Sequence, residues 1–173
     1  MDNDELKHHF DAVRGGDKQA FTSIYNELKT PIYAVINRIT HDEALSNDVM
    51  HDVFVKLFCS PPEPSVKNPR AWVFQMAHNL AIDSIRRPVQ SELSEEIEDT
   101  KVKLEETVGT RLDIESSMQR LPHDEFEIVM MRVNGELKFK EVANILCLPL
   151  GTVFWKYQKA ITKLRTYLNG GVV

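Results

Sequence analysis

The sequence of 173 residues lacks most of the features that mark membrane, secreted and metal-binding chains. No apolar run approaches the ~18 residues of a membrane-spanning helix, and the acidic N-terminus is the opposite of a basic signal-peptide start. Cys59 and Cys147 stand alone, so neither a disulfide scaffold nor a structural zinc site is expected. Seven glycines exclude a collagen-like chain. These absences predict a cytoplasmic protein without a cofactor.

The chain also lacks an excess of basic charge. It has 21 basic and 26 acidic side chains, a net charge of −5, so bulk attraction to nucleic acid is excluded. The charge is unevenly spread: residues 1–90 carry −2, residues 91–117 carry −6 and residues 118–173 carry +3, with no acid after Glu141. This pattern predicts a first domain at 1–90, an acidic flexible linker at 91–117 and a second domain at 118–173.

Both predicted domains have helical periodicity, and nothing in the first has the alternation of a strand. Asp17 and Asp42 precede two helices as candidate N-caps, and the prolines after Ser60 end the second of these. A third helix is expected from about Arg70 to Arg87, before Pro88. Apolar residues mark the inner faces of the first two helices, at Phe21, Ile24, Tyr25, Leu28 and Ile32 and at Val49, Val53 and Leu57.

The second domain reads as helices separated by short turns. A helix after Leu121 is closed by Asn134 and Gly135, and a short helix from about Lys138 precedes a longer one from Thr152 to Leu168. The last two resemble a helix-turn-helix, whose second helix enters the major groove of DNA. A solvated lysine face remains the alternative. The candidate duplex-reading residues of this unit, about Lys138 to Tyr157, are Thr152, Phe154, Trp155, Lys156, Gln158 and Lys159.

Three segments resemble the sigma-70 family of bacterial RNA polymerase, in its extracytoplasmic-function group. The first comprises Gln19 to Tyr33 and then Asp48 to Phe58. Its second stretch is similar to the core-polymerase-binding pattern D-l-x-Q-E-x-F-x-K-L-W, with His51 in place of the usual glutamine and Phe58 in place of the usual tryptophan. An ordinary solvated acidic face is the alternative. The resemblance implies that the polymerase contacts are Asp48, His51, Asp52, Val55 and Lys56.

The second segment, from Asn68 to Arg87, is the most specific match. It is close to the family pattern N-P-R-A-W-L-y-x-I-A-x-N-x-a-x-D-x-x-R-R, which reads the melted strand of the minus-ten element. An amide can pair with an exposed base edge, and cations can hold the phosphates. Trp72 is expected to be a core residue rather than a base contact. The resemblance implies that the minus-ten contacts are Lys67, Asn79, Arg86 and Arg87.

The third segment, from Leu121 to Leu168, resembles the half of the family that reads the minus-thirty-five element as duplex. It departs where the bases are usually read, because Phe154 and Trp155 replace a basic and small pair. Cys147 replaces the usual glycine of the turn. The promoter sequence therefore does not carry over from the family, and weak duplex affinity is expected.

The resemblance implies an all-α protein of two small helical domains and a non-catalytic specificity subunit. Its implied partners are core RNA polymerase, promoter DNA and an anti-sigma factor, for which the apolar Val55 and Trp155 are candidate contacts. Without an excess of basic charge, the free chain should bind DNA weakly.

Two alternatives stay open. One is a metal-dependent phosphohydrolase, whose metal ligands would come from the pairs His41-Asp42 and His51-Asp52 together with His8, His9 and Asp83. A sigma-like regulator that has lost duplex reading through Phe154 and Trp155 is the other.

Overall fold

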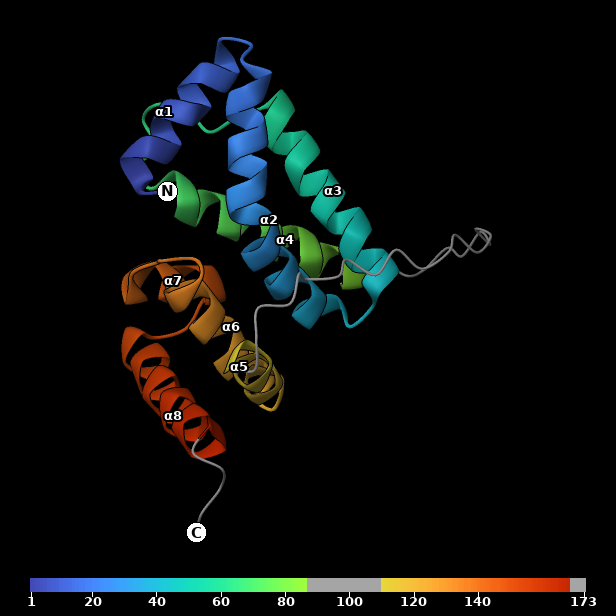
Figure 1. The fold of residues 1–173 in the computed structure, drawn as a ribbon. Coiled ribbons are helices and arrows are strands. Elements are labelled where there is room, and N and C mark those ends of the chain that lie inside the picture. Colours follow the sequence, from blue (N-terminus) through green and yellow to red (C-terminus); the bar gives the residue numbers. More distant parts are fainter. Residues whose placement is uncertain (87–109, 169–173) are drawn as a thin grey trace.

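The computed structural model describes residues 1–86 and 110–168, and it is entirely helical in that part of the chain (Figure 1). Most of the predicted acidic linker and Arg87 lie outside the described residues. None of the described helices is long and apolar enough to cross a bilayer. The helices are α1 (Asn3–Arg14), α2 (Lys18–Thr40), α3 (Glu43–Cys59), α4 (Pro69–Arg86), α5 (Thr110–Gln119), α6 (His123–Val133), α7 (Phe139–Leu146) and α8 (Leu150–Leu168).

Helix α1 was not expected from the sequence. The Asp2 carboxylate caps it by accepting from the Asp4 and Glu5 amides at 2.9 and 2.8 Å. One face, with Leu6 and Phe10, is buried in the N-terminal bundle of α1 to α4. The aspartate before the helix and the spacing of Leu6 and Phe10 would have been enough to predict α1 from the sequence.

The predicted caps of α2 and α3 are confirmed. The Asp17 carboxylate accepts from the Gln19 and Ala20 amides, and the Asp42 carboxylate accepts from the Leu45 amide at 2.9 Å. Of the predicted inner faces, Ile24, Leu28 and Ile32 of α2 and Val49, Val53 and Leu57 of α3 are buried. Phe21 and Tyr25 of α2 are only partly buried against the core. Helix α3 ends before Ser60 as expected. The caps fix where α2 and α3 begin, and the buried faces pack α2, α3 and α4 against one another.

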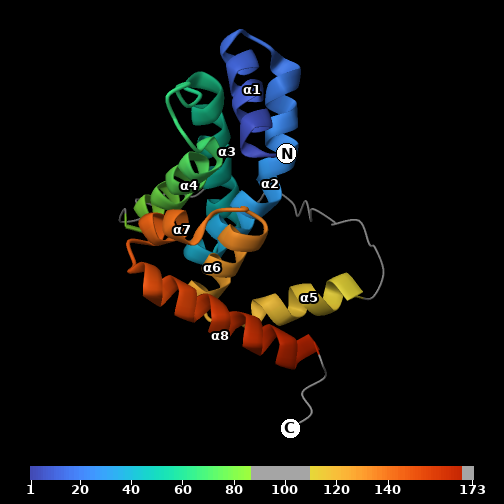
Figure 2. The same cartoon turned by 90° about the vertical axis from the view of Figure 1, so that its left-hand side faces the viewer.

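The C-terminal half consists of α5 to α8, with α8 packed across α5, α6 and α7 (Figure 2). Helix α8 begins two residues before the expected Thr152. The Pro149 carbonyl accepts from the Thr152 and Val153 amides at 3.0 and 3.1 Å and so adds a first turn. Leu121, Val129, Ala160 and Leu164 form the buried core between α6 and α8.

The two halves are in contact, with α6 against α2 and α7 against α4 (Figure 1). One apolar cluster runs through both, because Ile128 and Met131 of α6 and Val142 of α7 are fully buried together with the N-terminal core. Asn68 donates from Nδ2 to Glu141 Oε1 at 2.6 Å across the contact. The division at 1–90 and 118–173 stays a prediction.

Candidate functional site

The outer face of α3 carries the predicted polymerase contacts. Asp48, His51, Asp52, Val55 and Lys56 are all exposed, whereas Val49, Val53 and Leu57 face the core. Within the described residues, neither Asp48 nor Asp52 has an ion-pair partner. The face therefore offers two free carboxylates at helical spacing, beside the apolar Val55, to a basic partner.

An open groove of about 300 Å³ lies along α4, and one α3 side chain, Lys56, reaches it. Lys56 of α3, a predicted polymerase contact, lines it together with Asn79 of α4, a predicted minus-ten contact. Asn79 is exposed, and its Oδ1 accepts from Gln75 Nε2 at 3.1 Å. Trp72 is half-buried: it packs against the hydrophobic core, as expected, and also lines the groove.

The remaining minus-ten candidates lie at the two ends of α4. Lys67 is exposed in the proline loop, defined here as residues 60–68, which precedes α4. Arg86 is exposed in the last turn of α4. The described cations thus flank the groove at Asn79, while Arg87 is outside the described residues.

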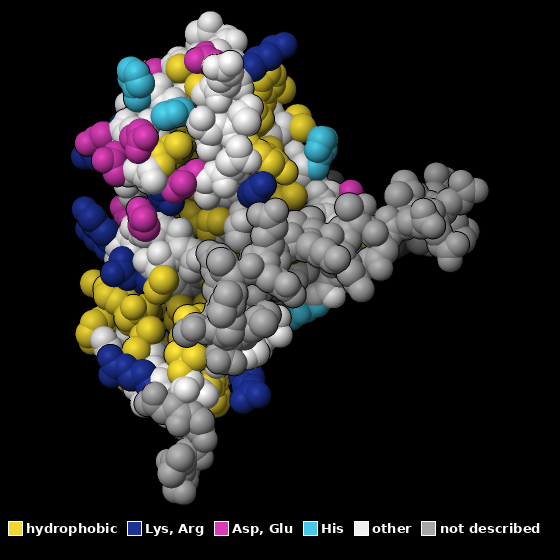
Figure 3. Space-filling view, in the orientation of Figure 1, with side chains coloured by type: hydrophobic (Ala, Val, Ile, Leu, Met, Phe, Trp, Pro, Cys, Tyr) yellow, Lys and Arg dark blue, Asp and Glu magenta, His cyan; other side chains and the backbone are white. Residues whose placement is uncertain are grey.

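Helices α7 and α8 form the predicted helix-turn-helix. Cys147 closes α7 with a φ of 53°, in the left-handed region that the usual glycine would occupy more easily. On α8, Phe154, Trp155, Gln158 and Lys159 are exposed and Thr152 and Lys156 are half-buried. The Phe154 ring meets the Phe139 ring edge-on at 5.4 Å. Figure 3 shows apolar side chains gathered over α7 and the start of α8.

The lysines of α8 are largely paired with acids of α6. Lys156 forms an ion pair with Asp124, and this hydrogen bond is the main reason why the pKa of Asp124 is lowered. Lys163 Nζ contacts Glu125 at 2.7 Å, and Lys159 Nζ lies 3.8 Å from the same carboxylate. Lys159 also lies over the Trp155 ring, at 4.9 Å. Much of the basic charge that the sequence assigned to DNA is therefore neutralised within the domain.

Titratable groups gather where α6 meets the N-terminal half. Glu127 is buried, and desolvation, reinforced by the Asp124 charge, raises its pKa to about 7 against the opposing effect of Arg38. The Glu127 and His123 side chains are 3.5 Å apart, while burial lowers the pKa of both His123 and His78. A neutral His123 therefore does not compensate the Glu127 carboxylate near pH 7.

No group of three or more histidine, cysteine or acidic side chains in the described part of the chain is placed to hold a metal ion. The phosphohydrolase alternative thus finds no metal centre among residues 1–86 and 110–168. His41 instead meets the His123 ring edge-on, with ring centroids 5.6 Å apart.

Comparison with known proteins finds similarity to RNA polymerase sigma factors. Residues 24–89, which span most of α2 and all of α3 and α4, match Sigma-70 region 2. The chain is 23% identical to the ECF RNA polymerase sigma factor SigW of Bacillus subtilis, over 95% of this chain and 97% of that protein. The chain is therefore similar to the sigma-70 family. These matches support an RNA polymerase sigma factor of the extracytoplasmic-function group, a group that directs transcription initiation.

Further sigma factors extend the similarity across both halves. SigK of Mycobacterium tuberculosis (strain ATCC 25618 / H37Rv) is 23% identical over 91% of this chain and 90% of that protein. The fold matches CnrH in complex with the cytosolic domain of CnrY, with a TM-score of 0.58, 18% identity and coverage of 97% and 99% of the two chains. It also matches RpoE of Bartonella quintana in complex with the anti-sigma factor NepR, with a TM-score of 0.55 and 16% identity. This match covers 87% of this chain and 99% of that chain.

Proposed function

We propose that this sigma factor is a dissociable, non-catalytic subunit that binds core RNA polymerase and reads both promoter elements. The exposed face of α3 would bind the polymerase, α4 and the proline loop would hold the melted minus-ten strand, and α8 would dock at the minus-thirty-five duplex. The observation that carries the proposal is the groove, because Lys56 of α3 and Asn79 of α4 both line it. Polymerase binding and strand capture would then occur side by side.

The groove has chemistry suited to an unstacked base. Its volume of about 300 Å³ is at the lower end of small-molecule sites. The Asn79 amide offers a donor and an acceptor to a Watson–Crick edge, and the half-buried Trp72 offers an apolar wall. Lys67 and Arg86, outside the groove, would hold the flanking phosphates.

The two halves would have to separate for both elements to be read. About 25 positions lie between minus ten and minus thirty-five, which is roughly 85 Å of duplex at ~3.4 Å per base pair. In the described structure α7 touches α4, and Asn68 and Glu141 are 2.6 Å apart. We therefore propose that the contact of α6 and α7 with α2 and α4 belongs to the free chain and opens in the polymerase complex.

An anti-sigma factor is the further partner that we propose. The two structural neighbours are both held by another protein, the cytosolic domain of CnrY in one and NepR in the other. The exposed Val55 and Trp155, at 44% and 59% exposure, are candidate apolar contacts on α3 and α8. Such a complex would form in the cytoplasm, where core polymerase is found.

Charge reversal on α3 tests the polymerase contact. In pull-down of purified core polymerase, Asp48→Lys and Asp52→Lys should each weaken binding, because each places a cation against a basic partner. Glu5→Lys is the matched control, since Glu5 is exposed on α1. Undiminished binding by both α3 variants would remove the assigned surface.

A sigma factor that has lost duplex reading is the second candidate, and the pairing of Lys156 and Lys163 with α6 favours it. Run-off transcription from templates randomised at the minus-thirty-five element separates the two. A selected sequence supports duplex reading, whereas transcripts with no preference there support its loss.

A further inference from the structure

The proline loop depends on side chains from outside it. Pro61, Pro62 and Pro64 have no N–H to donate. Within the loop, the described backbone–backbone hydrogen bond closes a turn: the Val66 amide donates to the Glu63 carbonyl at 3.0 Å. Pro62 is buried, so its carbonyl needs a donor from another element.

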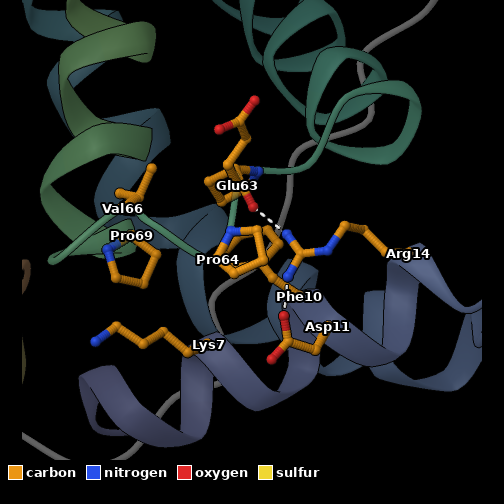
Figure 4. A pocket seen from close by; sticks show the side chains of 9 residues that line it. Lys7, Phe10, Asp11, Arg14, Glu63, Pro64, Val66 and Pro69 are labelled. Atoms are coloured by element: carbon orange, nitrogen blue, oxygen red, sulfur yellow. Dashed lines mark hydrogen bonds and ion pairs between the residues drawn. The ribbon is translucent and has the colours of Figure 1, made fainter.

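Helix α1 supplies that donor. Arg14, in its last turn, donates from Nη1 to the Pro62 carbonyl and forms an ion pair through Nη2 with Asp11, one turn earlier (Figure 4). Asp11 thereby orients the guanidinium. The planar guanidinium of an arginine can bind two fixed partners through its two terminal nitrogens, whereas the single ammonium group of a lysine cannot. Arg14 thus ties the loop to α1.

The contact between α1 and the loop is a packing contact and not a ligand site. The hollow between them has a volume of only about 50 Å³, room for one or two water molecules. Phe10, at 1% exposure, fills the space on the α1 side, and Pro62 and Pro69 are buried on the other. The apolar packing of Phe10 against Pro62 and Pro69, together with the hydrogen bond from Arg14 to the Pro62 carbonyl, holds the loop in one conformation.

The far end of the loop is held differently. Asn68 Oδ1 accepts from the Ala71 amide at 3.0 Å and caps α4, while Asn68 Nδ2 donates to Glu141 of α7. The contact with Glu141 is lost when the halves separate as proposed above. In the opened chain, the Arg14 hydrogen bond and the apolar packing against Phe10 still hold the loop to α1.

We propose that Arg14 is a positioning residue for minus-ten reading, which acts through the Pro62 carbonyl and sets the shape in which the proline loop presents Lys67 to the melted strand. The inference rests on the proposed function. It gives α1, which lies outside the matched residues 24–89, a role in promoter selectivity. Loss of the tie widens the range of loop shapes, so mismatched strands are accepted nearly as well as the preferred one.

The test uses a template library randomised over the minus-ten element, transcribed by core polymerase with the full chain and read by sequencing the transcripts. Wild type should select a preferred element over its single mismatches. Arg14→Ala should lower that preference by about tenfold, or about 1.4 kcal/mol. Arg14→Lys keeps the positive charge but lacks the two terminal guanidinium nitrogens, so its preference should lie between those of wild type and Arg14→Ala. Lys18→Ala, an exposed cation at the start of α2, should match wild type.

The preference is a ratio between templates in one reaction, so a smaller folded fraction of a variant lowers both signals and leaves the ratio unchanged. An unchanged ratio for Arg14→Ala overturns the inference and leaves the proposed function intact. If wild type yields no transcripts beyond those of core polymerase alone, the proposed function is wrong, and the inference falls with it.

Discussion

Replacement of Glu127 by glutamine should stabilise the protein in a pH-dependent way. The Glu127 side chain is 6% exposed, and its Oε1 has no hydrogen-bond partner among the described residues. Its pKa rises from 4.5 to about 7, and such a shift corresponds to about 3 kcal/mol at roughly 1.4 kcal/mol per pH unit. This is an upper figure, because the glutamine amide also needs partners.

The pH window follows from the direction of the shift. An acid whose pKa is higher in the folded state destabilises that state as pH rises above 4.5, and the penalty is complete above about 7. Glu127→Gln should therefore change the free energy of unfolding little at pH 4.5 and increase it by about 1–3 kcal/mol at pH 8.

Urea unfolding of wild type and variant at both pH values measures the difference. The exposed Glu5→Gln variant controls for the loss of one negative charge. An equal gain at the two pH values, or a loss at pH 8, would refute the reasoning, because a change in packing or net charge alone has no such pH dependence.

Three further substitutions have defined outcomes. Cys147→Gly should raise the free energy of unfolding by about 0.5–1 kcal/mol, because the φ of 53° strains a residue that has a Cβ. An unchanged melting temperature would contradict backbone strain at this position. Gly135→Ala should destabilise by about 1–3 kcal/mol in urea unfolding, because a Cβ there would lie 2.6 Å from the Met131 carbonyl oxygen and 3.0 Å from the Phe74 ring; wild-type stability would count against it. Asp124→Asn should free Lys156 and increase filter retention of duplex DNA, an effect that added salt should abolish.

Local chemistry made much of the fold predictable from the sequence. Asp17 and Asp42 are aspartates placed directly before apolar helical patterns, so capping identified both helix starts. The same rule applied to Asp2 would have found α1, whose Leu6 and Phe10 are spaced for one face. That helix was missed because short, strongly charged segments at chain ends resemble solvated tails.

Pairing between distant elements was not predictable in this way. Asp124 and Lys156 are 32 residues apart, and nothing in their spacing places α6 against α8. The groove has the same origin: Lys56 and Asn79 were assigned to different functions on different helices, and only the packing of α3 on α4 joins them. The residues of a site could be named from the sequence, but their charge states and neighbours could not.

The pairing within the C-terminal half strengthens the expectation of weak DNA binding by the free chain. Affinity for duplex comes mainly from cations that replace counterions on phosphates. Lys156 and Lys163 are already satisfied by acids of α6, and Lys159 is shared between Glu125 and the Trp155 ring. Each would have to break an internal contact before it neutralised a phosphate. Duplex binding then needs a high local concentration, which tethering to polymerase through α3 would supply without any new contact to DNA.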